Sequence, residues 1–451
     1  MIERTGNLYK LYKWFLPGLN VKRWLLLAIV GGALLLDGVT RFLAAEGADF
    51  HINQTIDQIA LGHIPLGWID WIFMIVGLVF VVVGIRAWFR SIVAVITPNR
   101  KDHILEILVE RRQLTKGAKI VAIGGGTGLS TLLRGLKHYT TNITAVVTVS
   151  DDGGSSGRLQ RELGVLPPGD IRNCLVALAD SERLITELFQ YRFSEGDGLA
   201  GHSFGNLLLA ALTAVTGGFD IAIRESSRVL AIRGRVLPST LSAARLCAEL
   251  EDGTIVEGET KISQSTKRIS RVFLDPRHCE PLHEVIQAIR EADVIILGPG
   301  SLYTSIMPNL LVDGIADEIA RSKAVRIYVC NVMTQPGETH GYSAADHVQA
   351  INALVGERLY DYVIVNDTPP HRLRERYAAE GQEPVEPAVD ALRALGFTPI
   401  VASVISEEQA VRHDSDRLAQ TIMATVAEAH GLSEVPRPAA PSAPTASAIA
   451  E

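Results

Sequence analysis

The sequence predicts an α/β protein with a Rossmann-like, mostly parallel sheet, helices on both faces and a small β insert, preceded by a two-helix transmembrane hairpin. Short β-branched runs alternate with helical patterns over most of the chain, which is typical of a parallel sheet covered on both faces. Glycine-rich segments directly follow several of these runs, as in folds that bind ligands at the carboxyl ends of strands. Two apolar runs near the N-terminus reach bilayer length with their flanks.

The apolar runs, residues 24–36 and 71–85, contain no charged residue. They predict helices at about 24–45 and 66–86 within an N-terminal membrane hairpin at residues 1–90. Lys and Arg lie before and after the pair, but none lies between residues 42 and 85. The positive-inside rule therefore predicts a two-pass protein of the cell membrane, with both termini and the main domain cytoplasmic.

Two other interpretations of the N-terminal region fit the sequence less well. A cleaved signal peptide would end near Ala45, but its basic lead of 23 residues is long for that role. A buried pair of core helices would not explain why basic residues flank the pair and acidic residues fill the loop.

Composition excludes several classes. The 451 residues are 47% hydrophobic, which excludes a disordered chain. The net charge of −7 argues against a nucleic-acid partner. The four cysteines are scattered without a Cys-x-x-Cys motif, so neither a disulfide framework nor a structural zinc site is expected.

The rest of the chain divides into segments that differ in composition and residue pattern. We expect a juxtamembrane connector at residues 91–117, an α/β domain at 118–432 and a disordered tail, rich in Pro, Ala and Ser, at 433–451. Residues 249–273 combine Asp-Gly and Glu-Gly turns with short alternating runs and predict a β-hairpin insert. The predicted strands of the sheet are residues 119–123, 142–150, 293–297, 325–330 and 362–365.

Two glycine-rich segments are candidate anion sites. Residues 124–128 (GGGTG) stand between a predicted strand and a predicted helix. Glycines allow close approach of the backbone, and a helix N-terminus offers free N–H groups and a partial positive charge. The segment is neither a Walker A loop nor a complete Gly-x-Gly-x-x-Gly motif. Residues 298–301 (GPGS) follow a later strand in the same way, and Asn331 follows the next one.

Three further motifs carry polar groups. In residues 150–158 (SDDGGSSGR), the adjacent acids suit Mg²⁺ or a sugar or base, and Arg158 suits a phosphate. In residues 167–173 (PPGDIRN), Asp170 suits either a helix N-cap or, with Asn173, the ligand cleft.

Residues 201–206 (GHSFGN) offer His202 for proton transfer, for capping or for the edge of the core, and Asn206 for ligand contact. The segment fits Gly-x-Ser-x-Gly by letter, but a loop rather than a strand precedes it, so we do not expect a nucleophile elbow.

Six segments, taken together, resemble the gluconeogenesis factor family, whose bacterial members bind uridine-diphosphate sugars and share their fold with the 2-phospho-L-lactate transferases. They are GGGTGLSTLLRGLK, DDGGSSGRL, PPGDIRN, GHSFGNLLLAAL, GPGSLYTSIMPNLL and YVCNVMTQPGET. The resemblance spans residues 119–410, and the hairpin departs from the usual soluble members. The resemblance implies a nucleotide-sugar site formed by Gly125, Gly126, Thr127, Gly128, Asp151, Asp152, Ser155, Ser156, Arg158, His202, Asn206, Gly300 and Ser301. The motifs themselves add Asp170, Asn173 and Asn331 to this set of candidate residues.

The resemblance implies a membrane-tethered regulator that binds a UDP-sugar and links carbon metabolism to cell shape or envelope synthesis. On this interpretation the protein is a non-catalytic homo-oligomer without a required cofactor, and the hairpin places it beside envelope-synthesis proteins. The alternative is a Mg²⁺-dependent transferase of the 2-phospho-L-lactate type, in which Asp151 and Asp152 hold the metal. The Gly-Gly-Ser-Ser-Gly-Arg run after Asp152 favours the first branch. A third possibility is a membrane scaffold with a vestigial pocket.

Overall fold

The computed structural model describes residues 21–45, 67–96, 112–180, 183–407, 410–432 and 438. Most of the predicted connector and all of the predicted tail except Pro438 lie outside these residues. The chain forms two compact units, Met1–Val109 and Glu110–Glu451, and each is described by itself.

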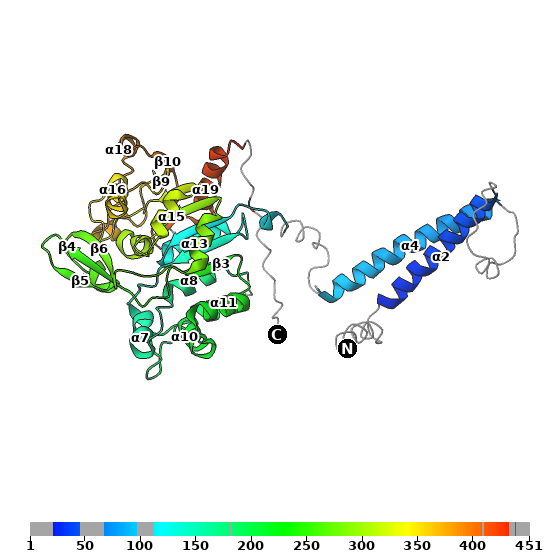
Figure 1. Ribbon diagram of the computed structural model, residues 1–451, viewed down its shortest axis with the longest axis horizontal. Helices are drawn as coiled ribbons and strands as arrows, with labels where there is room; N and C mark the ends of the chain where they lie inside the picture. Colours follow the sequence, from blue (N-terminus) through cyan, green and yellow to red (C-terminus); the bar gives the residue numbers. More distant parts are fainter. Residues whose placement is uncertain are drawn as a thin grey trace. The chain divides into compact units, whose positions relative to one another are not determined.

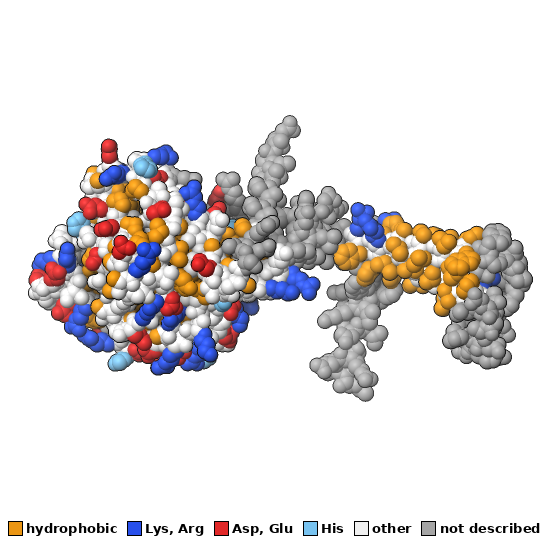
Figure 2. All heavy atoms as spheres, turned by 90° about the horizontal axis from the view of Figure 1, so that it is seen from above, with side chains coloured by type: hydrophobic (Ala, Val, Ile, Leu, Met, Phe, Trp, Pro, Cys, Tyr) orange, Lys and Arg blue, Asp and Glu red, His pale blue; other side chains and the backbone are white. Residues whose placement is uncertain are grey.

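The N-terminal unit contains two long helices, α2 (Val21–Ala45) and α4 (Gly67–Ile96), which lie side by side (Figure 1). Their segments Arg23–Phe42 and Trp71–Ser91 are long and apolar enough to cross a membrane. Only 11% of each apolar window is buried, which argues against a pair of core helices, and Figure 2 shows hydrophobic side chains over much of the visible helix surface. The second helix continues past its predicted end near residue 86.

Glycines set how closely the two helices approach. The rings of Phe42 and Trp71 lie 5.3 Å apart at one end, while Gly84 contacts Ala28 farther along, so the helices run antiparallel. A Cβ atom on Gly31 would lie 2.7 Å from the Phe80 Cβ. The close packing of the hairpin therefore requires glycine at this position.

The substitution Gly31→Leu is expected to weaken the pairing of α2 and α4 by about 1–3 kcal/mol, because the added side chain overlaps the facing helix. Cross-linking between cysteines introduced by F42C and W71C measures the pairing in detergent micelles. Gly32→Leu is the matched control, because a Cβ on Gly32 meets no atom within 4 Å in the described residues. Equal cross-linking of the two leucine variants would contradict this packing.

The second unit is built on a seven-stranded sheet in which every neighbouring pair is parallel, as predicted. The strand order is β10-β9-β8-β7-β1-β2-β3. The bounds are β1 (Ile120–Gly124), β2 (Ile143–Val147), β3 (Arg235–Pro238), β7 (Val294–Leu297), β8 (Val325–Val329), β9 (Tyr362–Asn366) and β10 (Thr398–Ala402).

Helices cover both faces of this sheet (Figure 1). In β1, Ile120 and Ala122 pack on one side, and Val121 and Ile123 pack on the other, so the strand is apolar throughout. The first face carries α6 (Gly126–Leu136), α8 (Gly169–Leu178), α10 (Phe204–Thr216), α11 (Phe219–Val229) and α19 (Ser415–Ala429). The second carries α13 (His283–Arg290), η1 (Leu302–Ile306), α14 (Met307–Leu310), α15 (Ile315–Arg321), α16 (Ala344–Val355) and α18 (Val389–Ala394).

The predicted insert is larger than a hairpin. It is a three-stranded antiparallel sheet in the order β5-β4-β6, because the strand before residue 249 also pairs. Its elements are β4 (Arg245–Leu250), β5 (Ile255–Glu257), α12 (Glu259–Ser263) and β6 (Ile269–Asp275). Smaller elements complete the unit: α7 (Gly154–Leu163), α9 (Arg183–Gln190), α17 (Arg374–Ala379), β11 (Ile405–Ser406) and β12 (Arg412–His413).

The strand order creates a switch point at β1. From β1 the chain adds β2 and β3 on one side, then returns to place β7, β8, β9 and β10 on the other. In open parallel sheets, ligands bind outside the carboxyl ends of the strands where the order reverses. The crevice between the ends of β1 and β7 is therefore the expected binding position, and both predicted glycine loops begin there.

Candidate functional site

The two glycine loops meet at the switch point. A Cβ atom on Gly128 would lie 2.5 Å from the Pro299 carbonyl oxygen, and one on Gly300 would lie 3.4 Å from the Gly125 carbonyl oxygen. The backbones after β1 and β7 therefore touch, and at Gly128 no larger residue fits without separating them.

A cavity of about 420 Å³ opens where the loops meet. The predicted residues that line it are Gly125, Gly126, Thr127, Gly128, Gly300, Ser301 and Asn331. The remainder of its wall includes residues that the sequence did not indicate, among them Glu259, Gln335, Tyr377, Gln382, Arg412 and His413. The two loops are thus parts of one cavity, together with a C-terminal segment that has no recognisable motif.

The N-terminus of α6 supplies the N–H groups on the β1 side. Gly125 precedes the helix in an extended conformation, and Gly126 has φ +63°. Thr127 and Gly128 lie in the first turn of α6, and both residues line the cavity. The N–H groups of a first helical turn have no acceptor within the helix. The amides and the positive end of the helix dipole favour an anionic group here.

The loop after β7 opens a helical segment, as predicted, but the segment begins as a different kind of helix from α6. Leu302–Ile306 forms a five-residue π-helical turn before the short helix α14. Its polar groups are held by side chains: the Gly300 N–H donates to Asn331 Oδ1 over 3.3 Å, and Gln335 Nε2 donates to Ser301 Oγ over 2.9 Å. The polar groups at the start of this segment are therefore already engaged in hydrogen bonds within the wall.

Asp170 lies against the first loop and does not cap α8, whose N-cap is Pro168. Its buried carboxylate accepts a hydrogen bond from the Gly126 N–H, and a Cβ on Gly125 would lie 2.7 Å from its Oδ2. Burial, together with the charge of Asp151, raises the pKa of Asp170 to about 7. Asp170 therefore fixes the glycine loop from outside the lining of the cavity.

The substitution Asp170→Asn is expected to remove part of the pH dependence of stability. The pKa of Asp170 is about 7 in the folded protein and ordinarily 3.8, so the folded state binds more protons between these values and stability falls as pH rises through them. Asparagine keeps a hydrogen-bond acceptor but does not ionise. The free energy of unfolding of D170N should therefore rise relative to that of wild type by up to roughly 4 kcal/mol between pH 4 and pH 8.

Urea unfolding at pH 4, 6 and 8 measures this effect. Asp390→Asn is the control, because the Asp390 side chain is 99% exposed. If the stabilities of wild type and D170N fall in parallel with pH, the raised pKa is wrong.

The two adjacent acids do not share one position. Asp151 Oδ1 accepts the Gly153 N–H over 3.0 Å. Asp152 Oδ1 accepts the backbone N–H and the hydroxyl of Thr260, over 2.9 and 2.7 Å. In the described residues no three His, Cys, Asp or Glu side chains converge as metal ligands. The two carboxylates are thus oriented by different neighbours, Asp151 by its own loop and Asp152 by the insert.

Glu259 brings the insert to the cavity. It lines the wall, and its Oε2 is buried without a hydrogen-bond partner among the described residues. Burial and the charges of Asp170 and Asp151 raise the pKa of Glu259 well above its ordinary value. Burial also lowers the pKa of His413 to about 4. Arg412 is therefore the one permanent cation in the described lining of this cavity.

The remaining predicted residues form a separate network outside the lining. Ser155 Oγ lies 2.9 Å from His202 Nδ1 and accepts a hydrogen bond from Asn206 Nδ2 over 3.1 Å. Burial and then the charge of Arg158 lower the pKa of His202. The structure thus connects Ser155, His202 and Asn206 to one another, and they are not among the residues that line the cavity between the glycine loops.

The neighbours of this network are equally well defined. Ser156 Oγ accepts the Gly169 N–H over 3.1 Å, and Asn173 Oδ1 accepts from Arg172 over 2.8 Å. Ser203 caps α10 by accepting the Asn206 N–H, and residues 194–200 before it form a loop. A capping serine after a loop is not a nucleophile elbow, as predicted.

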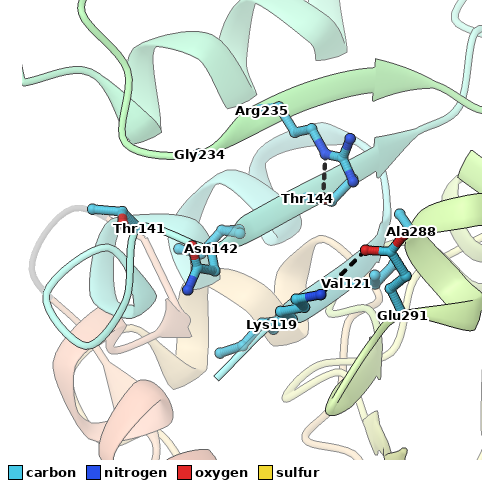
Figure 3. Close-up of a pocket in the computed structure, with 11 residues that line it drawn as sticks. Lys119, Val121, Thr141, Asn142, Thr144, Gly234, Arg235, Ala288 and Glu291 are labelled. Carbon is cyan, nitrogen blue, oxygen red and sulfur yellow. Dashed lines mark hydrogen bonds and ion pairs between the residues drawn. The ribbon is translucent and has the colours of Figure 1, made fainter. Parts of the chain in front are cut away.

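A second hollow lies at the other end of the strands, around the beginnings of β1, β2 and β3 (Figure 3). Its charged groups have partners: Lys119 Nζ lies 3.2 Å from Glu291 Oε2, and Arg235 Nε donates to Thr144 Oγ1 over 2.7 Å. Because it lies at the amino ends of the strands, away from the switch point, we do not assign ligand binding to it.

The fold and the cavity define the class: a doubly covered parallel α/β protein with a cavity between two glycine loops at the switch point of its sheet. The profile of the family described as 2-phospho-L-lactate transferase CofD matches residues 120–405. A putative gluconeogenesis factor of Nostoc is 49% identical over 425 residues, which are 93% of each chain. The gluconeogenesis factor of Bacillus subtilis is 51% identical over 307 residues, 68% of this chain and 97% of that one.

A crystal structure of a UPF0052 family member from Bacillus halodurans is 51% identical, with a TM-score of 0.66, and covers 68% of this chain and 99% of that one. The chain belongs to the gluconeogenesis factor family, within the CofD group. The N-terminal unit is not peculiar to this chain, because the Nostoc relative aligns over more residues than the α/β unit contains. The Bacillus relatives correspond in length to the α/β unit alone.

Proposed function

We propose that the protein binds a nucleotide-diphosphate sugar, of the UDP-sugar type, in the cavity between the β1 and β7 loops. The observation that carries the proposal is that the N-terminus of α6 and Arg412 line one cavity. A diphosphate has the charge that helix amides and an arginine favour. About 420 Å³ is also within the range of small-molecule sites.

The neutral polar groups of the wall suit the rest of such a ligand. Asn331, Gln335 and Gln382 offer both donors and acceptors to a sugar or a base, and Tyr377 offers an aromatic ring. The proposed role is recognition without turnover. The hairpin would hold this sensor at the cytoplasmic face of the membrane, where it would link carbon metabolism to envelope synthesis or cell shape.

Calorimetric titration of the full chain in detergent tests the proposal. We expect saturable binding of UDP-N-acetylglucosamine and UDP-glucose and much weaker binding of free N-acetylglucosamine, because the diphosphate contributes most of the recognised charge. If no uridine nucleotide binds, the proposed function is wrong.

The second candidate is a transferase of the 2-phospho-L-lactate type, favoured by the family profile over residues 120–405. Incubation with lactyl-diphosphoguanosine and a deazaflavin acceptor tests it, with release of GMP as the readout. GMP release at a rate above that of a Gly128→Ala variant would favour the enzyme.

A further inference from the structure

Three arginines converge beside the segment that connects α9 to α10. Arg158 on α7 donates to the Ala200 carbonyl oxygen over 2.8 Å, and Arg192 donates to the Gly201 carbonyl oxygen. Arg172 on α8 lies close enough that the charge of Arg192, after burial, lowers its pKa. Two consecutive carbonyl groups thus each hold one guanidinium group, and Arg172 lies within the electrostatic range of Arg192.

These arginines differ from others of the α/β unit because no carboxylate pairs with them in the described part of the chain. Their hydrogen-bond partners among the described residues are carbonyl oxygens and the Asn173 side chain. By contrast, Arg290 and Arg326 form ion pairs with Glu318 and Asp361. Each guanidinium has five N–H donors, so most of the donors on Arg158 and Arg192 are not used by these bonds.

One buried donor of the cluster, Nε of Arg172, also has no partner among the described residues. Buried donors without acceptors are rare and unfavourable in folded proteins. An oxyanion between the arginines would satisfy the Arg172 donor and offset three positive charges.

Three acidic residues act on this cluster or on its neighbour His202. Asp170 and Asp151 act on Arg172 from the side of the cavity, and Glu162 on α7 acts on His202. None of these acids forms an ion pair with the three arginines within the described residues. The three guanidinium groups therefore have these acids near them but no carboxylate bonded to them among the described residues.

We propose that Arg158, Arg172 and Arg192 form a second binding site, for the phosphomonoester group of a soluble metabolite, separate from the cavity between the glycine loops. Guanidinium groups bind phosphate through paired hydrogen bonds, which favours phosphate over a simple halide. The site is connected to the cavity, because α8 carries both Arg172 and Asp170, which bonds to Gly126. The proposal does not depend on the identity of the ligand in the cavity.

The test uses the full chain in detergent and follows its thermal unfolding midpoint in potassium phosphate or glucose 6-phosphate, against potassium chloride at matched ionic strength. We expect a saturable rise with either phosphate compound, since a ligand of the folded state stabilises it. The double variant Arg158→Gln, Arg192→Gln should bind phosphate at least tenfold more weakly. The control Arg224→Gln, Arg228→Gln removes the same charge from α11 and should respond as wild type does.

The variant Arg412→Gln separates the two sites: it should lose UDP-sugar affinity but keep the phosphate response, and the arginine double variant should do the reverse. If the double variant does not fold, Arg192→Gln alone, at an exposed position, should bind phosphate at least threefold more weakly. A response that is lost with Arg412 but kept without Arg158 and Arg192 would overturn the proposal, as would the absence of a saturable response in wild type. A midpoint that rises with soluble short-chain phosphatidic acid but not with glucose 6-phosphate or phosphate would assign the site to a lipid and also overturn it.

Discussion

The substitution Gly128→Ala is expected to abolish measurable binding of a nucleotide sugar and to lower the free energy of unfolding by about 1–3 kcal/mol. The added methyl group would lie 2.5 Å from the Pro299 carbonyl oxygen and 2.8 Å from its carbonyl carbon. Because both contacts are to backbone, no side-chain rotation relieves them, and the β1 and β7 loops must separate. The N–H groups at the start of α6 then no longer face the wall formed by Gly300 and Ser301.

Calorimetry with UDP-N-acetylglucosamine and urea unfolding measure the two effects. The matched control is Gly124→Ala, four residues earlier, where an added Cβ would meet only ordinary contacts at 3.7 Å from Leu129 and 3.8 Å from Gly298. Wild-type binding by the Gly128 variant would mean that the contact between the loops is not needed for the site.

The substitution Arg412→Gln is expected to reduce the affinity for a nucleotide diphosphate by 10- to 100-fold, about 1.5–3 kcal/mol, which is the usual contribution of a hydrogen bond to a charged group. Arg412 is the permanent cation of the described cavity wall, so its loss leaves the diphosphate with the α6 amides alone. Arg412→Lys should recover part of the affinity, because lysine keeps the charge without the paired donors.

The control is Arg417→Gln on α19, an exposed arginine that does not line the cavity. Titration of all three variants with UDP-glucose separates a local effect from a change in net charge. Equal weakening by the Arg412 and Arg417 variants would show that only long-range charge acts.

The sequence predicted the central strands but not the edges of the sheet. The strands that begin near Ile120 and Val294 are continuous apolar runs, as expected for strands buried on both faces. The edge strands were missed because Arg235–Pro238 ends in proline and Thr398–Ala402 contains one. Proline is tolerated at sheet edges, where an N–H group has no partner strand, and it obscures the strand pattern.

Some residues of the site stand in local sequence motifs, and others reach it only through the tertiary fold. The loops at Gly125 and Gly300 could be predicted because each motif directly follows its strand. Arg412 could not, since it stands on a two-residue strand without a motif and reaches the cavity only through the tertiary fold. The structure places Asp152 against Thr260 of the insert and Ser155 against His202, so segments adjacent to the cavity in sequence face other neighbours in space.

A crystal structure of the α/β unit with UDP-N-acetylglucosamine tests the central claim most directly, and the Bacillus halodurans relative shows that a chain of this length folds and crystallises alone. We expect the diphosphate within hydrogen-bonding distance of the Thr127 and Gly128 N–H groups, with Arg412 on its opposite side. A diphosphate bound elsewhere, with the cavity between the glycine loops empty, would contradict the account.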